Sequence, residues 1–341
     1  MKIEVYSPTI RRKEMDAVLT ALVEDQIGPG EQTRLLLQHA KDALGFDYCI
    51  ALRSPVFALY TALKLLNLED GQGVVLSAFS PRYYLRVIHD LRLTPVFCDV
   101  PPYSACPSRE TIEDALTDPD VESRCVALHH TLGFVPDTDA ISQLGLPIIE
   151  DVSPSYGTIK EENSAPSPAV FTILGLEAAD MLTAGGGALL YSINRRDTAA
   201  LRTLEELPPE YRLADMNAAM AAVQFRESAK NLVKRRDIAQ VYVQAAMRTR
   251  HKRFVQDETY NNYAFPLILE TGLKDVKAYA KRKDIAVESA FERTLIAAVA
   301  GLDTRCPESY ALSLRTVLFP IYPRLGASAI EHVAKLLGSL P

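Results

Sequence analysis

Three residues with acidic or imidazole side chains stand where short apolar segments end: Asp99, His130 and Asp151. In open sheets of parallel strands, ligands bind beside the carboxyl ends of the strands, so side chains at these ends are the first candidates for chemistry. Asp151 comes after the apolar residues 147–149. We interpret it either as a ligand-contacting acid at the end of a central strand or as the cap of the next helix.

The adjacent residues His129 and His130 raise the question of a metal site. Successive residues of a strand point to opposite faces of a sheet, so the two rings cannot easily bind one ion. His130 is therefore a candidate ligand contact or a packed strand end. The five cysteines are scattered and contain no C-x-x-C pair, which argues against a disulfide framework and against a thiolate zinc site. We predict no metal.

Short apolar segments alternate with segments of helical spacing through the first half of the chain. This alternation predicts an α/β protein with a parallel sheet covered on both faces, because a parallel connection needs a crossover helix. A hairpin-like pair and a long Ala-rich helix follow, and the last third mixes strands and helices. Strands are expected at 48–52, 73–77, 94–100, 124–130, 147–151, 169–174, 187–193, 262–269 and 317–320, and the main helices at 56–67, 81–92, 109–117, 138–144, 216–247, 273–283 and 328–337.

The charge balance bears on both partners and domains. The 341 residues include 37 Lys and Arg against 43 Asp and Glu, the wrong sign for a protein that gains affinity by neutralising nucleic-acid phosphates. Residues 1–225 hold 18 basic and 31 acidic residues, whereas residues 226–341 hold 19 and 12. This change predicts two domains, 1–225 and 226–341, connected by the helix across residue 225. The basic run 234–236 is interpreted as a solvated helix face or, alternatively, as a contact for a nucleotide diphosphate or an acidic partner.

The sequence contains no apolar run of membrane-spanning length, and its first residues lack the pattern of a secretory signal. We expect a cytoplasmic protein without a membrane partner.

Several segments resemble, in order, the sequence blocks of one protein family. They are Ile3–Ile10, Gly28–Glu31, Leu91–Val100 (LRLTPVFCDV), His130–Ile141 (HTLGFVPDTDAI), Ile149–Gly157 (IEDVSPSYG), Glu210–Gln224 (EYRLADMNAAMAAVQ) and Phe319–Leu325 (FPIYPRL). The chain thereby resembles the DegT family of sugar-nucleotide aminotransferases, which are pyridoxal-phosphate (PLP) enzymes of fold type I. The resemblance implies an aspartate-aminotransferase-like fold, with a large α/β/α domain around a mainly parallel sheet and a smaller C-terminal α/β domain. It also implies a homodimer with active sites at the subunit interface.

PLP chemistry needs a lysine amine, an acid at the pyridine nitrogen and donors around the phosphate. The resemblance places Asp151 at the position of the acid. The position of the lysine falls on Glu177 when it is counted forward from residues 171–173, and on Asp180 when it is counted back from residues 182–185. No lysine lies between Lys160 and Lys230.

The implied phosphate contacts have changed as well. In the segment that resembles the phosphate loop, Pro55 lacks a backbone N–H and Val56 lacks a hydroxyl, although Ser54 remains. Thr172 takes the place of a phosphate-binding serine. Elsewhere, Pro154 replaces a glutamine that packs near the cofactor ring, and Glu210 replaces an asparagine that reaches the partner subunit's phosphate.

We therefore predict a DegT-like pseudoenzyme that has lost PLP binding and transamination and keeps a dimer-interface cleft for another small ligand or partner. One alternative is a PLP-dependent aminotransferase of a nucleotide-linked keto-sugar, which would need a lysine from elsewhere, Lys160 being the nearest. Another is a PLP-independent enzyme in which Glu177 or Asp180 transfers a proton beside Asp151. If PLP binds, Asp151 and Thr172 would hold it. The residues expected around the cleft are Ser54, Ser80, Arg82, Tyr83, His130, Ser153, Tyr156 and Glu210.

Overall fold

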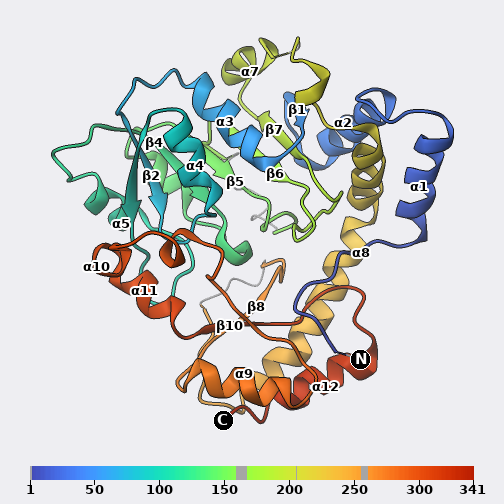
Figure 1. The fold of residues 1–341 in the computed structure, drawn as a ribbon, viewed down its shortest axis with the longest axis vertical. Helices are drawn as coiled ribbons and strands as arrows, with labels where there is room; N and C mark the ends of the chain where they lie inside the picture. Colours follow the sequence, from blue (N-terminus) through green and yellow to red (C-terminus); the bar gives the residue numbers. More distant parts are fainter. Residues whose placement is uncertain (1, 159–166, 205, 255–259) are drawn as a thin grey trace.

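The computed structural model describes residues 2–158, 167–204, 206–254 and 260–341, and a seven-stranded sheet dominates it (Figure 1). Only β7 runs antiparallel to its neighbours, β1 and β6, so the predicted α/β class with a mainly parallel sheet is confirmed. The strands, in spatial order, are β1 (Tyr48–Leu52), β7 (Ala188–Ser192), β6 (Phe171–Gly175), β5 (Ile148–Asp151), β4 (Ser123–His129), β2 (Gly73–Ser77) and β3 (Thr94–Cys98).

Helices cover both faces of this sheet because its strands are apolar on both faces. On β5, for example, Ile149 packs in the cluster formed with α3 and α4, whereas Ile148 packs with α5 and α6. Helix α3 starts where the sequence signals a start, with Ser54 accepting a hydrogen bond from Phe57 N and Pro55 at the first position. The covering helices are α3 (Pro55–Leu65) and α4 (Tyr83–Asp90) on one face, and α2 (Glu31–Leu44), α5 (Arg109–Ala115), α6 (Thr138–Ser142) and the start of α8 on the other.

Helix α8 (Asp215–Ala246) connects the large sheet to a smaller unit. Its first half, around Ala218, packs against the large sheet, and its second half, around Tyr242, packs in the core of the smaller unit. Helix α1 (Arg12–Val23) lies along α8. The smaller unit contains the antiparallel sheet β8 (Phe265–Ile268), β10 (Thr316–Phe319) and β9 (Glu288–Ser289), with α9 (Leu273–Lys281) and α12 (Ala327–Leu337).

The chain then crosses back to the large unit. Phe291, Leu302 and Leu312 are buried in the same core as β2 and β5, and the Phe291 ring stacks on Phe79 with centroids 3.7 Å apart. Arg82 secures this return by donating hydrogen bonds to the carbonyls of Glu292 and Thr294. The predicted division into domains 1–225 and 226–341 stays a prediction. Part of the second predicted domain packs in the core of the large unit. Three shorter helices, α7 (Arg195–Arg202), α10 (Leu302–Arg305) and α11 (Pro307–Ser313), complete the fold together with the 3-10 turns Thr131–Gly133, Pro209–Tyr211 and Leu295–Ala297.

Among these described residues, no helix combines the length and apolar character that crossing a membrane would require.

Candidate functional site

Asp151 ends β5 at the carboxyl edge of the sheet, and its carboxylate is bound by neighbouring side chains. Oδ2 accepts hydrogen bonds from the hydroxyls of Tyr83 (3.1 Å) and Tyr84 (3.0 Å) at the start of α4. Oδ1 accepts from Ser153 N (3.1 Å) and from the Ser153 hydroxyl, whose oxygen accepts from Gly175 N (2.6 Å). A carboxylate offers about four acceptor positions. With Asp151 only 2% exposed, four internal donors occupy them.

Burial and the Asp151 carboxylate raise the pKa of Tyr83 and of Tyr84 well above its ordinary value. Both phenols therefore stay protonated and remain donors to Asp151. Two aromatic rings thus lie directly beside the acid that the sequence singles out.

Asp180, rather than Glu177, lies at this edge. Its Oδ2 accepts a hydrogen bond from Glu177 N (2.8 Å), and a side chain at Gly175 would collide with the Asp180 carboxylate and the Ser153 hydroxyl. The Glu177 side chain is exposed. Burial, reinforced by the nearby carboxylates of Asp151 and Glu177, raises the pKa of Asp180 to about 8. A carboxyl group in this state can keep its proton at neutral pH.

This raised pKa has a consequence for stability. The pKa of Asp180 in the folded protein is higher than its ordinary value of 3.8. Its contribution to the free energy of unfolding is therefore fully present below pH 3.8 and is lost as pH rises through about 8. We expect Asp180→Asn to remove this dependence, so that the variant gains roughly 1 to 3 kcal/mol over wild type between pH 4 and pH 9. Urea unfolding at several pH values measures the difference. Glu113→Gln, at an exposed position on α5, is the control, and parallel pH profiles for wild type and Asp180→Asn would contradict the assignment.

A cavity of about 200 Å³ opens beside Asp180, between the large sheet and the smaller unit. Its wall combines aromatic rings with three carboxyl groups and one guanidinium. Asp151, Tyr83 and Tyr84 do not line this cavity. The residues that define its character are Tyr6, Phe79, His129, Asp180, Tyr263, Glu288, Glu292 and Arg293.

His129 borders this cavity, whereas His130 does not. His129 lies on the Asp151 face of the sheet, with its ring edge-on to Tyr84, and burial lowers its pKa. The His130 ring points to the other face, where its Nε2 lies 2.8 Å from Glu150 Oε1 and its Nδ1 lies 2.6 Å from the Ser155 hydroxyl. The structure therefore places His130 in a buried network, not at the cleft.

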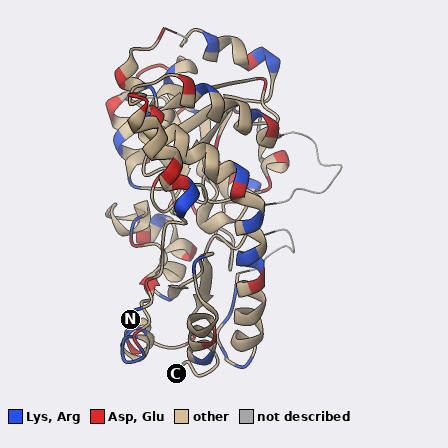
Figure 2. Cartoon of the chain, turned by 90° about the vertical axis from the view of Figure 1, so that its right-hand side faces the viewer, with Lys and Arg blue, Asp and Glu red and all other residues tan. Residues whose placement is uncertain are grey.

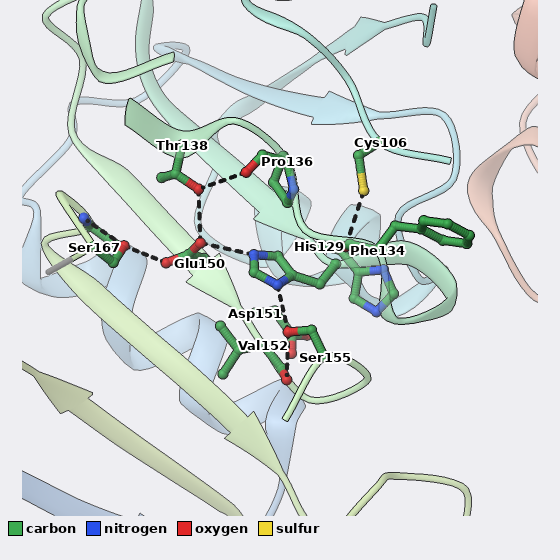
Figure 3. A network of polar contacts seen from close by, with 12 residues as sticks. Cys106, His129, Phe134, Pro136, Thr138, Glu150, Asp151, Val152, Ser155 and Ser167 are labelled. Atoms are coloured by element: carbon green, nitrogen blue, oxygen red, sulfur yellow. Dashed lines mark hydrogen bonds and ion pairs between the residues drawn. The ribbon is translucent and has the colours of Figure 1, made fainter. Parts of the chain in front are cut away.

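The centre of that network is the Glu150 carboxylate. Thr138 donates to Oε1 (2.9 Å) and Ser167 donates to Oε2 (2.5 Å) (Figure 3). Burial alone would raise the pKa of Glu150, but the charge of His130 and these hydrogen bonds outweigh it and lower the pKa to about 2. Glu150 is thus an ionised, internally paired group that stabilises the fold.

In the structure, the predicted phosphate-binding segment caps a helix and contributes to the packing of aromatic rings. Ser54 caps α3, as described above, and the Phe57 ring stacks on Tyr211 with centroids 4.7 Å apart. Glu210, in the turn beside Tyr211, is exposed to solvent. Among the described residues, no contact joins Glu210 to Asp151.

Other candidates lie apart from one another. Thr172 alternates with Phe171 and Ile173, which face the α3 side, so Thr172 and Asp151 lie on opposite faces of the sheet. The Tyr156 hydroxyl is 3.3 Å from the Ser228 hydroxyl on α8, away from the cavity.

Two more candidates have internal positions. Ser80 is fully buried, and its hydroxyl has no hydrogen-bond partner among the described residues. Asp99 caps α11 through Glu308 N (2.9 Å) and Ser309 N (2.8 Å). Lys160, the nearest lysine in sequence, falls outside the described residues.

Sequence reasoning missed His129 and the residues that the smaller unit contributes, Tyr263, Glu288 and Arg293. Strand alternation offered a signal for His129, because residues 127 and 129 share the face of 149 and 151. No local pattern marks the other three, since they reach the cavity only through packing of the two units.

Comparisons with known proteins agree with this architecture. The model of the DegT/DnrJ/EryC1/StrS aminotransferase family matches residues 8–338, so the chain belongs to that family. It is 22% identical to the dTDP-4-dehydro-2,3,6-trideoxy-D-glucose 4-aminotransferase of Saccharopolyspora spinosa, over 97% of this chain and 95% of the relative.

Two solved structures show the same fold. One is the aminotransferase TlmJ from Streptoalloteichus hindustanus, with a TM-score of 0.88 and 20% identity, covering 99% of this chain and 98% of TlmJ. The other is the GDP-4-keto-6-deoxy-D-mannose-3-dehydratase of E. coli with bound hydrated PLP, with a TM-score of 0.84 and 14% identity, covering 99% of each chain. The homodimer implied by the family resemblance stays a prediction.

The residues at the carboxyl edge do not fit PLP as a Schiff base. The acid that would hold the pyridine nitrogen already accepts four hydrogen bonds. No lysine is present among the described residues that line the cavity, and Asp180 brings a carboxyl group to the lysine's expected region. The first residue of α3 is a proline, which has no N–H for a phosphate.

Proposed function

We propose that this protein binds a small polar ligand in the cavity between its two units and does not form a Schiff base with PLP. The observation that supports the proposal most directly is the Asp151 carboxylate, whose acceptor positions are taken by Tyr83, Tyr84 and Ser153. A bound pyridine ring would have to displace the buried Tyr84 and the half-buried Tyr83 from this carboxylate.

The charges around the cavity indicate the chemistry of the ligand. Asp180 can keep its proton at neutral pH, and the carboxylates of Glu288 and Glu292 face the guanidinium of Arg293 and the amine of Lys277, which lies 3.8 Å from Glu292. The cavity therefore offers a phosphate dianion no excess of positive charge. The aromatic rings of Tyr6 and Tyr263 suit the apolar face of a sugar or a cationic group. We propose a neutral or cationic polyhydroxylated ligand.

The test is exposure of the purified protein to PLP, followed by dialysis, an absorbance spectrum, and intact mass after borohydride reduction. We expect no retained aldimine band and no mass increase. Equilibrium dialysis of PLP is the second readout, because a fold relative holds hydrated PLP. We expect no saturable binding.

Controls distinguish the alternatives. A family member that keeps its lysine serves as the positive control, and Lys160→Met tests the lysine nearest in sequence. A stable adduct lost in Lys160→Met would overturn the proposal in favour of a PLP-dependent aminotransferase of a nucleotide-linked keto-sugar, the activity that the relatives' names suggest. Noncovalent PLP binding lost in Asp151→Asn would also overturn it.

A second candidate function is PLP-independent proton transfer by Asp180. It is favoured by one observation: a carboxyl with a pKa of about 8 on the wall of the cavity, which can act as a general acid near neutral pH. Asp151, Tyr83 and Tyr84 would then hold the groups around Asp180 in position and exclude water from them. The pH dependence of Asp180→Asn described above tests the pKa on which this candidate depends.

A further inference from the structure

We propose a second ligand site, for a phosphate group, in the groove between the start of α1 and the middle of α8. The groove encloses about 440 Å³ and is distinct from the cavity beside Asp180. The proposal does not depend on the function proposed above. The groove is built from Arg11, Arg12, Lys13, Lys230, Asn231 and Lys234, together with two acids.

Positive charge is in excess here. Glu227 binds both Lys13 (2.7 Å) and Lys230 (3.2 Å), and these two amines lower its pKa. Arg11 and Lys234 have no ion-pair partner among the described residues. The other acid, Glu14, is buried and accepts hydrogen bonds from Arg11 N (2.9 Å) and Gln224 Nε2 (2.7 Å), so it is already bound.

This excess lies within a chain whose net charge is −6. Figure 2 shows the side of the molecule on which α1 and α8 lie, where Lys and Arg positions recur along the ribbon. A restricted basic groove of this kind suits a small anion better than a long polyanion. Arginine and lysine together are the side chains that bind phosphate oxygens most often, arginine through paired N–H donors.

Asn231 supplies the independent sign of a ligand. It is only 8% exposed, lines the groove, and its Oδ1 has no hydrogen-bond partner in the described part of the chain. A buried polar atom without a partner costs about 1 to 3 kcal/mol, so such atoms usually contact a ligand or water. Oδ1 can accept from the hydroxyl of a hydrogen phosphate, and Nδ2 can donate to one of its other oxygens.

The backbone favours the same ligand. The first N–H groups of a helix lack intrahelical acceptors, and the helix dipole places partial positive charge at that end. Helix α1 has 12 residues and begins at Arg12, inside the groove. A phosphate bound there would accept hydrogen bonds from the backbone N–H groups of α1 on one side and from the side chains of α8 on the other.

The test is isothermal titration of the full chain with pyrophosphate and with inorganic phosphate at low ionic strength. We expect saturable binding of pyrophosphate. The double variant R11A/K234A, which removes the two unpaired cations, should weaken binding at least tenfold, and Asn231→Ala should weaken it several-fold. The matched control R226A/R236A removes two exposed cations of α8 outside the groove and should change affinity less than twofold.

Each variant is first checked for an unchanged unfolding midpoint without ligand. Equal affinity for phosphate and pyrophosphate would identify a single phosphate group as the ligand, and tighter pyrophosphate binding would identify a diphosphate. Absence of saturable binding to wild type, or an equal loss in R226A/R236A, would overturn the proposal. Neither result bears on PLP, so this test and that of the cavity fail independently.

Discussion

Glu150→Gln is expected to lower the free energy of unfolding by about 3 kcal/mol, because it replaces a buried carboxylate that holds three neighbouring side chains. Glu150 Oε1 lies 2.8 Å from His130 Nε2 and accepts a hydrogen bond from Thr138, and its Oε2 accepts one from Ser167. A glutamine amide has one acceptor oxygen instead of two. Its NH2 group would therefore face a donor at one of these positions.

The loss should depend on pH. The pKa of Glu150 is lowered from 4.5 to about 2, so its contribution is present above pH 4.5 and is lost as pH falls toward 2. Urea unfolding between pH 3 and pH 8 measures the difference between wild type and variant, which should narrow at the acid end. Glu113→Gln, at an exposed position on α5, is the control. A cost at pH 7 no larger than that of Glu113→Gln would show that the pair does not stabilise the fold.

Arg235→Met is expected to cost about 3 kcal/mol, since it removes charge-assisted hydrogen bonds from a buried site. One nitrogen of Arg235, Nη1, donates to the carbonyls of Asn262 (3.2 Å), Tyr263 (3.0 Å) and Ile321 (2.9 Å). Burial lowers the pKa of Arg235 to about 10, which still leaves the group charged at neutral pH. This side chain therefore holds α8 to two segments of the smaller unit.

Chemical unfolding measures the loss, and hydrogen exchange should show faster exchange in β8 and β10. Arg235→Lys keeps the charge but not the fork of donors, so it should recover only part of the stability. The neighbouring Arg236 is exposed, and Arg236→Met should leave stability within about 0.5 kcal/mol of wild type. Similar losses for the two arginines would contradict the role assigned to Arg235.

Local sequence signals predicted the large sheet well, because short apolar strands and their helices are encoded in consecutive residues. The end of β5 at Asp151 and the cap of α3 at Ser54 follow from such signals. The hairpin-like pair predicted at 169–174 and 187–193 corresponds to β6 and β7, which pair antiparallel as expected. Strand 94–100 was predicted two residues too long, since Asp99 turns away to cap α11.

The candidate site was predicted less completely, for two physical reasons. One residue of register decides the face of a strand, which is why His129 and not His130 borders the cavity and why Thr172 lies opposite Asp151. Other parts of the wall come from residues that are distant in sequence. Tyr263 and Arg293 line the cavity with Asp180 only because the smaller unit packs there. The sequence around these two residues contains no local pattern that predicts this position.

The return of residues 291–312 to the large core makes the two units interwoven. Phe291 and Leu312 fill positions in a core that residues 1–225 build only in part. We therefore expect that cutting the chain after residue 225 would expose apolar surface around Phe79 and leave the first part unable to fold by itself. A movement of the smaller unit away from the large one would also break the hydrogen bonds of Arg82 with Glu292 and Thr294. For the ligand proposed above, we expect exchange through small rearrangements of the cavity rim near these contacts.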